Sequence, residues 1–246
     1  MKRGLVVLTT FLGAHVLLSC SGDEREPPRH GIGKRVVMPP IDLPDLPEAP
    51  ASGATGSGGT GTPAFLPGSG FWGTVSGMEL RIQEALFVSG AFVVGTEVPT
   101  VAVLLSDAPN LCEILQKDGM PRDSTLFGLA FLDPAGSPIV PGDYVVPDGF
   151  PDRVSAMAMF NRFDAECHAT LGMERGLGRG GAARLARLVP GTEAAGSFSV
   201  RMGDQQDLVS GTFRARFCDA PGFFADYTRL LDPSVSADQC FDHAAL

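Results

Sequence analysis

The sequence lacks three features that would assign it to a common functional class. Its 19 lysine and arginine residues are outnumbered by 28 aspartate and glutamate residues, which gives a formal net charge of -9. Nucleic-acid binding requires a basic surface that displaces counterions, so this balance argues against a nucleic-acid partner. The apolar run Gly4–Leu18 is shorter than the roughly 20 residues needed to span a bilayer. No GxSxG elbow, HExxH zinc helix or Walker A loop occurs, and no catalytic residue is therefore predicted.

Glycine and proline are abundant but unevenly distributed. The chain has 31 glycines and 20 prolines, below the roughly 25–30 % of a chain disordered throughout. Residues 20–70 hold a large share of them, with prolines first and a glycine-rich stretch after. Such a segment cannot bury enough apolar surface to offset its ordering entropy, so we expect a disordered tether. Within it, Gly56–Gly61 spells GxGxxG without a preceding strand or a following helix, and we interpret this match as chance.

The N-terminus has the layout of an export signal. Met1-Lys2-Arg3 is a basic start, the apolar run follows it, and the run ends in Leu17-Leu18-Ser19-Cys20. This ending resembles the bacterial lipobox. The resemblance implies that residues 1–19 are a lipoprotein signal peptide and that Cys20 carries lipid, including palmitate. By the same resemblance, a serine rather than an aspartate directly after the cysteine, at Ser21, favours the outer over the inner membrane. The lipid bilayer is then a binding partner through the lipid on Cys20. A secretory signal that happens to contain a cysteine is the alternative.

Residues 71–246 show apolar alternation with a period of two. In 197–202 and again in 209–217, apolar and polar residues alternate on either side of the turn residues Gly203–Gln206, which predicts an antiparallel hairpin. Turn signals, among them Ser89-Gly90, separate further short strands. We therefore predict an all-β domain, an antiparallel β-sandwich of Ig-like or related type. The other candidate strands are Trp72–Ser76, Glu79–Val88, Val98–Leu105, Leu126–Leu132, Asp143–Val146, Ser155–Phe160 and Ala183–Val189.

Two short helices are expected to pack on the sandwich. Asn110–Glu113 has the pattern of a capping box and predicts a helix that stops near Gly119. A second apolar stripe at helical spacing follows Pro221 and ends before Pro233; its alternative role is an exposed partner-binding helix. That stripe consists of Phe223, Phe224, Tyr227, Leu230 and Leu231.

Four cysteines besides Cys20 make an even number in a chain expected to be exported, which predicts disulfides. Three pairings are possible, and we favour Cys218–Cys240 with Cys112–Cys167. Metal binding is the competing interpretation, because His168, Asp242 and His243 lie beside Cys167 and Cys240. Neither place has CxxC or HxxxH spacing, so we predict no metal site and no cofactor.

Two charged segments contain side chains that are suited to ligand binding. Asp143, Asp148 and Asp152 supply oxygen ligands of the kind calcium prefers, but without EF-hand spacing, which favours a solvated acidic loop. The segment Arg175–Arg187 contains Arg175, Arg179, Arg184 and Arg187. It is interpreted either as a flexible loop entering a strand or as a contact for an anionic surface such as lipopolysaccharide or an acidic glycan. Its Gly176–Gly181 repeats the GxGxxG spelling without a βαβ context.

Three segments of the domain resemble segments of uncharacterised Gram-negative bacterial lipoproteins: Leu105–Cys112, Pro141–Val146 and Gly196–Cys218. The resemblance implies an exported lipoprotein with a β-rich domain. We therefore expect a non-enzymatic, lipid-anchored envelope lipoprotein that binds an envelope protein or glycan. One alternative is an extracytoplasmic hydrolase whose Asp and Glu carboxylates converge only in space. Another is a structural envelope component with a partner beside it in the membrane.

Overall fold

The computed structural model describes residues 68–94, 96–149, 151–224 and 240–242. Two short helices are present, α1 (Leu111–Gln116) and α2 (Gly172–Gly176). No helix within the described ranges is long and apolar enough to cross a membrane. The strands are β1 (Gly70–Trp72), β2 (Glu84–Val94), β3 (Thr96–Ser106), β4 (Met120–Pro121), β5 (Ser124–Leu132), β6 (Gly142–Val146), β7 (Ser155–Phe163), β8 (Gly178–Val189), β9 (Glu193–Met202), β10 (Asp207–Phe217) and β11 (Cys240–Phe241).

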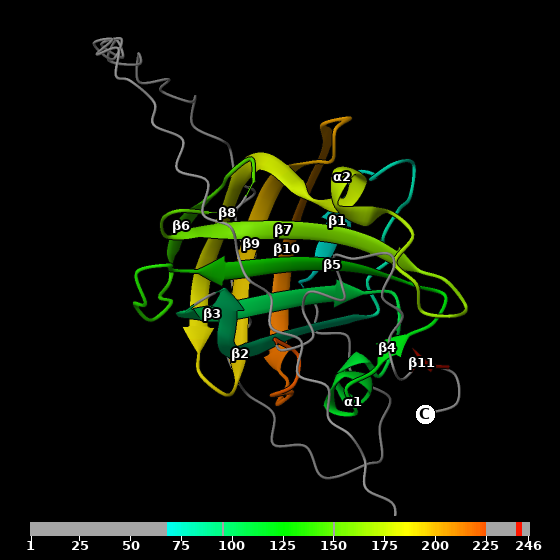
Figure 1. Ribbon diagram of the computed structural model, residues 1–246, viewed down its shortest axis with the longest axis horizontal. Helices are drawn as coiled ribbons and strands as arrows, with labels where there is room; N and C mark the ends of the chain where they lie inside the picture. The colour runs from blue at the N-terminus through cyan, green and yellow to red at the C-terminus, as the bar shows by residue number, and fades with distance from the viewer. Residues whose placement is uncertain (1–67, 95, 150, 225–239, 243–246) are drawn as a thin grey trace, which may run out of the picture. The chain divides into compact units, whose positions relative to one another are not determined.

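The strands form an all-β sandwich, as predicted. Neighbours hydrogen-bond in the order β6-β8-β9-β10-β2-β3-β5-β7, β1 pairs with β10, and β4 pairs with β11 in a separate small sheet. The large sheet folds over between β10 and β2. Strands β6, β8, β9, β10 and β1 form a first layer, and β2, β3, β5 and β7 form a second layer whose strands cross those of the first (Figure 1). Two pairings depart from the antiparallel prediction, because β10–β2 and β11–β4 are parallel over two residues each.

The second layer is buried on both of its faces. Its inner face meets the first layer in a core that includes Phe127, Phe160 and Phe198. Its outer face carries a second apolar cluster, which packs against α1 and the segment after β10. Strand β5 is consequently buried at all nine positions. This explains why its sequence is a continuous apolar run, whereas strands with one exposed face alternate.

Strands β9 and β10 make room for two aromatic rings with two glycines. Phe198 lies opposite Gly211, and Phe213 lies opposite Gly196. A Cβ atom at either glycine would come within 2.4 Å of the ring across from it. Each ring therefore occupies the space that a side chain on the partner strand would need, and this locks the register of the hairpin. The Phe198 ring also stacks on Phe127 of the second layer, with centroids 4.6 Å apart.

The passage from β10 to β2, which we call the layer joint, is held by backbone pairing over a short length. Arg216 and Phe217 pair in parallel with Leu86 and Phe87. The amide of the next residue, Cys218, donates a hydrogen bond to the Phe87 carbonyl at 2.8 Å. In the described part of the chain, this short ladder alone carries the hydrogen-bonded sheet from one layer to the other, so side-chain interactions have to reinforce it.

A buried carboxylate provides that reinforcement. Glu84 is 3 % exposed, forms an ion pair with Arg216, and accepts the Leu111 amide at 2.6 Å. The helix predicted near Asn110 is present as α1, but its N-terminus is stabilised by Glu84 rather than by a capping box. Asn110 has a left-handed backbone with φ of 60° and makes no side-chain cap, so Glu84 takes the place of the predicted capping box. The Cys112–Cys218 disulfide ties α1 to the same joint.

The structure differs in detail from the sequence-based predictions at one turn, at the start of the domain and at the C-terminal helix. Ser89-Gly90 is not a turn but lies inside β2, where a Cβ atom on Gly90 would meet the Phe224 ring at 2.5 Å. The first described strand, β1, starts at Gly70, one residue before the predicted domain start at Phe71. Of the predicted C-terminal helix, only the part up to Phe224 is described, where Pro221–Phe224 is a turn; the rest lies outside the described residues.

We predict that replacing Arg216 with methionine destabilises the fold by about 2–4 kcal/mol, because it leaves the buried Glu84 carboxylate without its cation. The free energy of unfolding of the full chain in urea measures this loss. Arg187→Met is the matched control, since the Arg187 side chain is 59 % exposed and Glu193 keeps Arg214 as a second partner; stability should change by less than about 1 kcal/mol. Equal losses in the two variants would contradict the role assigned to Glu84.

Candidate functional site

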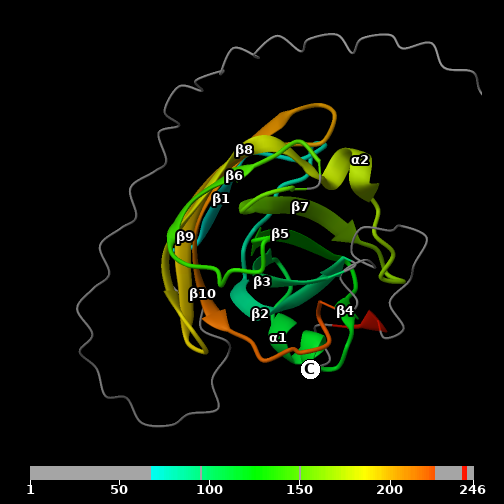
Figure 2. The ribbon, with the colours of Figure 1, turned by 60° about the vertical axis from the view of Figure 1, so that its left-hand side comes forward.

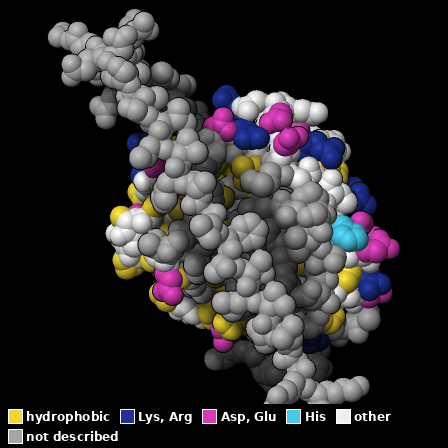
Figure 3. Space-filling view, in the orientation of Figure 1, with side chains coloured by type: hydrophobic (Ala, Val, Ile, Leu, Met, Phe, Trp, Pro, Cys, Tyr) yellow, Lys and Arg dark blue, Asp and Glu magenta, His cyan; other side chains and the backbone are white. Residues whose placement is uncertain are grey.

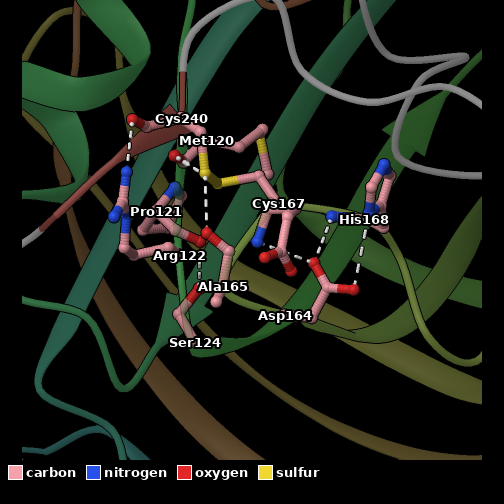
Figure 4. The surroundings of a disulfide bond; sticks show 10 residues. Met120, Pro121, Arg122, Ser124, Asp164, Ala165, Cys167, His168 and Cys240 are labelled. Atoms are coloured by element: carbon pink, nitrogen blue, oxygen red, sulfur yellow. Dashed lines mark hydrogen bonds and ion pairs between the residues drawn. A yellow bond between two sulfur atoms is a disulfide. The ribbon is translucent and has the colours of Figure 1, made fainter.

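The four described cysteines form two disulfides, as predicted, but with a different pairing. Cys112 bonds Cys218, and Cys167 bonds Cys240. The expected pairing Cys218–Cys240 with Cys112–Cys167 is therefore wrong. The reason is topological: α1 packs beside the end of β10, whereas β11 pairs with β4 next to the loop of Cys167 (Figure 4). Cys20 lies outside the described residues.

A polar loop beside the second disulfide brings together three groups of metal-ligand type. The ligand atoms of Asp164, Glu166 and His168 lie within 4.8 Å of one another. Asp164 accepts the amides of Glu166 at 3.0 Å and of His168 at 2.8 Å, and its carboxylate lies 3.5 Å from Nδ1 of His168. The His168 amide, the Glu166 amide and the His168 ring together hold the pKa of Asp164 below its usual range.

The disulfide beside this loop argues against the interpretation that Cys167 and Cys240 bind a metal ion. Cys167 and Cys240 are bonded to each other, so neither offers a thiolate. His243 lies outside the described residues. The space-filling view shows acidic and basic side chains lying together along the margin of the molecule, with a histidine among them (Figure 3). The Asp164–His168 pair is thus an exposed turn that fixes the loop carrying Cys167.

The segment Arg175–Arg187 divides into two parts with different surroundings. Arg175 donates to the carbonyls of Leu171 and Thr170, and Arg179 bridges Asp148 and Asp204 at 3.3 and 3.0 Å. Both guanidinium groups are thus used within the fold. Asp143, in turn, faces Arg184 on β8, so the carboxylates of Asp143 and Asp148 face different arginines rather than one another. The predicted acidic loop does not form a common ligand set through these two residues.

The remaining two arginines of the segment belong to a larger group on the outer face of the first layer. Residues paired across a sheet project to the same side. Arg187 thereby lies in line with Arg214 of β10, because both pair with Ala195 of β9. No described helix or strand lies on this outer side (Figure 2). We call this surface the arginine face; it carries Arg184, Arg187, Arg201, Arg214 and Arg216.

The arginine face is cationic although the whole chain is acidic. Three carboxylates pair with its arginines: Asp143 with Arg184, Glu193 with both Arg187 and Arg214, and Glu84 with Arg216. Five guanidinium groups against three carboxylates leave an excess of two positive charges. The fifth arginine, Arg201, is exposed and has no hydrogen-bond or ion-pair partner among the described residues.

An exposed aromatic residue adjoins this face. Trp72 of β1 pairs with Ser210 of β10 and is 53 % exposed, and nearby Leu208 is 63 % exposed. A Cβ atom built on Gly70 would lie 2.9, 3.0 and 3.5 Å from three atoms of the Trp72 six-membered ring. The ring therefore lies back over Gly70, with one side against the sheet and the other open to solvent.

Sequence reasoning missed most of this surface. Arg201, Arg214 and Arg216 alternate with buried residues along two strands, so no local run of positive charge marks them. For Trp72, the sequence pattern predicts only the start of a strand. The sequence nevertheless indicates this surface. Where arginines alternate with apolar residues along a strand, the apolar residues face the core and the arginines face the solvent on the other side of the sheet.

The hydrolase alternative requires carboxylates that converge in a cleft. The buried carboxylates of the described residues, Glu84 and Asp133, lie at opposite ends of the second layer, and Asp133 accepts the Ala135 amide at 2.9 Å. A small, partly open pocket on the second layer has an apolar lining, in which the Thr100 hydroxyl donates to the Val98 carbonyl. Neither arrangement brings together an acid and a base.

We predict that Asp164→Ala lowers the thermal stability of the chain near neutral pH, because the loop loses an acceptor for two amides. The pKa of Asp164 is lower in the folded chain than in the unfolded chain, so its contribution is complete above the ordinary Asp pKa of about 3.9 and is lost as the pH falls through the lower folded value. The difference in unfolding temperature between wild type and variant should therefore shrink below about pH 4. A difference that stays constant down to pH 2 would contradict this assignment.

Comparison with known proteins adds no identification: no protein-family model, no curated protein and no solved structure matches this chain.

Proposed function

We propose that this chain is a lipid-anchored lipoprotein of the bacterial envelope and that its β-sandwich is a glycan-binding module. The observation that carries the proposal is the arginine face with Trp72 beside it. Tryptophan and arginine are the side chains that most often dominate binding energy. Here both are exposed on a sheet face that no described element covers.

A glycan fits this face better than a folded protein. Protein interfaces have an apolar core that is depleted of charge. On this face the exposed large apolar residues form no continuous patch, because Trp72 and Leu208 lie on β1 and β10, whereas Val145 lies on β6 with β8 and β9 between. Between them lie the short side chains of Ser199 and Ser210, in line with Trp72. Guanidinium groups donate hydrogen bonds to sugar hydroxyls, and an open indole face accepts the C–H side of a sugar ring.

The anchor rests on the sequence, and the disulfides are compatible with it. The lipobox resemblance at Leu17–Cys20 and the following tether predict attachment through Cys20. Two disulfides suit an oxidising extracytoplasmic compartment. A diacyl or triacyl anchor carries more than one chain, which is what stable attachment requires.

The anchor is tested by expressing the full chain and a Cys20→Ala variant in a Gram-negative host with labelled palmitate. We expect label and membrane fractionation for the wild type and neither for the variant, because only Cys20 is the predicted acceptor. The four other cysteines serve as an internal control, since they are disulfide-bonded. Label retained in the variant would overturn the assignment of Cys20.

Glycan binding is tested by electrophoresis of the detergent-solubilised full chain in native gels that contain an envelope polysaccharide. We expect retardation by at least one of peptidoglycan fragments, lipopolysaccharide and capsular polysaccharide, and none in gels without polymer. Identical mobility in all gels would overturn the glycan-binding proposal, whatever the outcome of the palmitate experiment.

A further inference from the structure

We propose that the arginine face binds an acidic polysaccharide, with Trp72 stacking on a sugar ring and Arg201 binding a carboxylate of the same polymer. This inference rests on the proposed glycan-binding function and narrows it to one class of ligand and one subsite. Three observations carry it: the placement of the Trp72 ring, the Arg201 guanidinium without a partner among the described residues, and the charge of the face.

Trp72 is held in the geometry that a stacking platform needs. Its ring lies over Gly70, where the missing side chain leaves the sheet surface bare. Strand β1 is fixed by pairing with β10 over three residues, and Thr212 donates to the Gly68 carbonyl at 2.8 Å. The inner side of the ring is therefore supported, and a ligand meets a surface that needs no rearrangement. Preorganisation of this kind lowers the entropy cost of binding.

Arg201 is the arginine of the face that is available to an incoming anion. Its strand neighbour across the pair is Leu208, which is apolar and cannot neutralise it. The other four arginines each have a carboxylate partner. From the registers of β9, β10 and β1, Arg201 lies about 7 Å along and about 10 Å across the strands from Trp72. Neighbouring units of one extended polymer can bridge such a spacing.

The charge distribution selects a carboxylated polymer over a neutral polymer and over an anionic membrane surface. Guanidinium groups bind carboxylates through charge-assisted, bidentate hydrogen bonds. A neutral glycan would leave the Arg201 charge unused. A phospholipid surface carries phosphate but no sugar ring, so it would leave Trp72 without a stacking partner, whereas an acidic polysaccharide supplies a ring and a carboxylate together.

The probe set separates the sugar ring from the charge. Polygalacturonate has both, its fully methyl-esterified form has the same rings without charge, and polyacrylate has carboxylates without rings. Trp72 is the only tryptophan of the chain, so its fluorescence reports directly on contact at the subsite. We expect polygalacturonate to shift the emission and to protect Trp72 from iodide quenching, with at least about tenfold weaker binding of either other probe.

Variants locate the site. Trp72→Ala and Arg201→Glu should each weaken the binding of polygalacturonate about tenfold or more, as measured by affinity electrophoresis, whereas Trp72→Phe should retain most of it. Arg162→Glu is the matched control, because Arg162 is an exposed arginine on β7 of the second layer and should leave affinity nearly unchanged. Thermal unfolding of each full-length variant separates loss of binding from loss of folding.

The outcomes distinguish this inference from the broader proposal. Equal binding of polygalacturonate and its methyl ester would overturn the acidic class and leave glycan binding standing. Unchanged affinity in folded Trp72→Ala or Arg201→Glu would overturn the subsite. Equal binding of polyacrylate would overturn the stacking role of Trp72. Absence of binding to every polysaccharide would overturn the proposed function itself.

Discussion

The structure depends on the layer joint, where the sheet passes from β10 to β2 by a two-residue parallel ladder. A ladder of that length contributes few hydrogen bonds, so an ion pair, a helix amide and a disulfide all converge on it. Glu84 is central because it contacts β10 through Arg216 and α1 through Leu111. Burying that carboxylate is favourable only while both partners are present. The fold of the second layer over the first is thereby coupled to the position of α1.

The way the sheet folds at the layer joint also determines which faces of the two layers are covered by other elements. Because the second layer is covered on both sides, most described positions of its strands are buried, and exposed positions such as Ser89 and Arg162 are few and scattered. Among the described elements, the first layer has neighbours on its inner side only. Its inner positions hold Phe198 and Phe213 over their partner glycines, which fills the core without using the outer positions. Those outer positions are therefore free to carry arginine, and the arginine face is the surface that this division leaves available.

The sequence predicts the elements better than their connections. Alternation identified the hairpin that became β9 and β10, since a strand with one buried face has a period of two. The helix near Asn110 was also predicted, but its start depends on Glu84, which lies 27 residues earlier in sequence. Gly90 was mistaken for a turn residue because its role, to admit the Phe224 ring, is set by a distant segment. The disulfide pairing failed for the same reason: it follows from which strands meet, and cysteine spacing alone does not contain that information.

The candidate site, too, depends on which strands lie side by side, and this could not be predicted from the sequence. A linear cluster, Arg175–Arg187, drew attention in the sequence, yet Arg175 and Arg179 are occupied within the fold. The cationic surface instead combines the two remaining arginines of that segment, on β8, with arginines of β9 and β10. At physiological ionic strength the Debye length is about 8 Å, so a bound group on this face experiences the nearby guanidiniums more strongly than the acidic remainder of the chain. At longer range the net charge of -9 repels anions. An acidic ligand is therefore attracted only once it is in contact with the arginine face, which makes binding a property of local geometry rather than of overall charge.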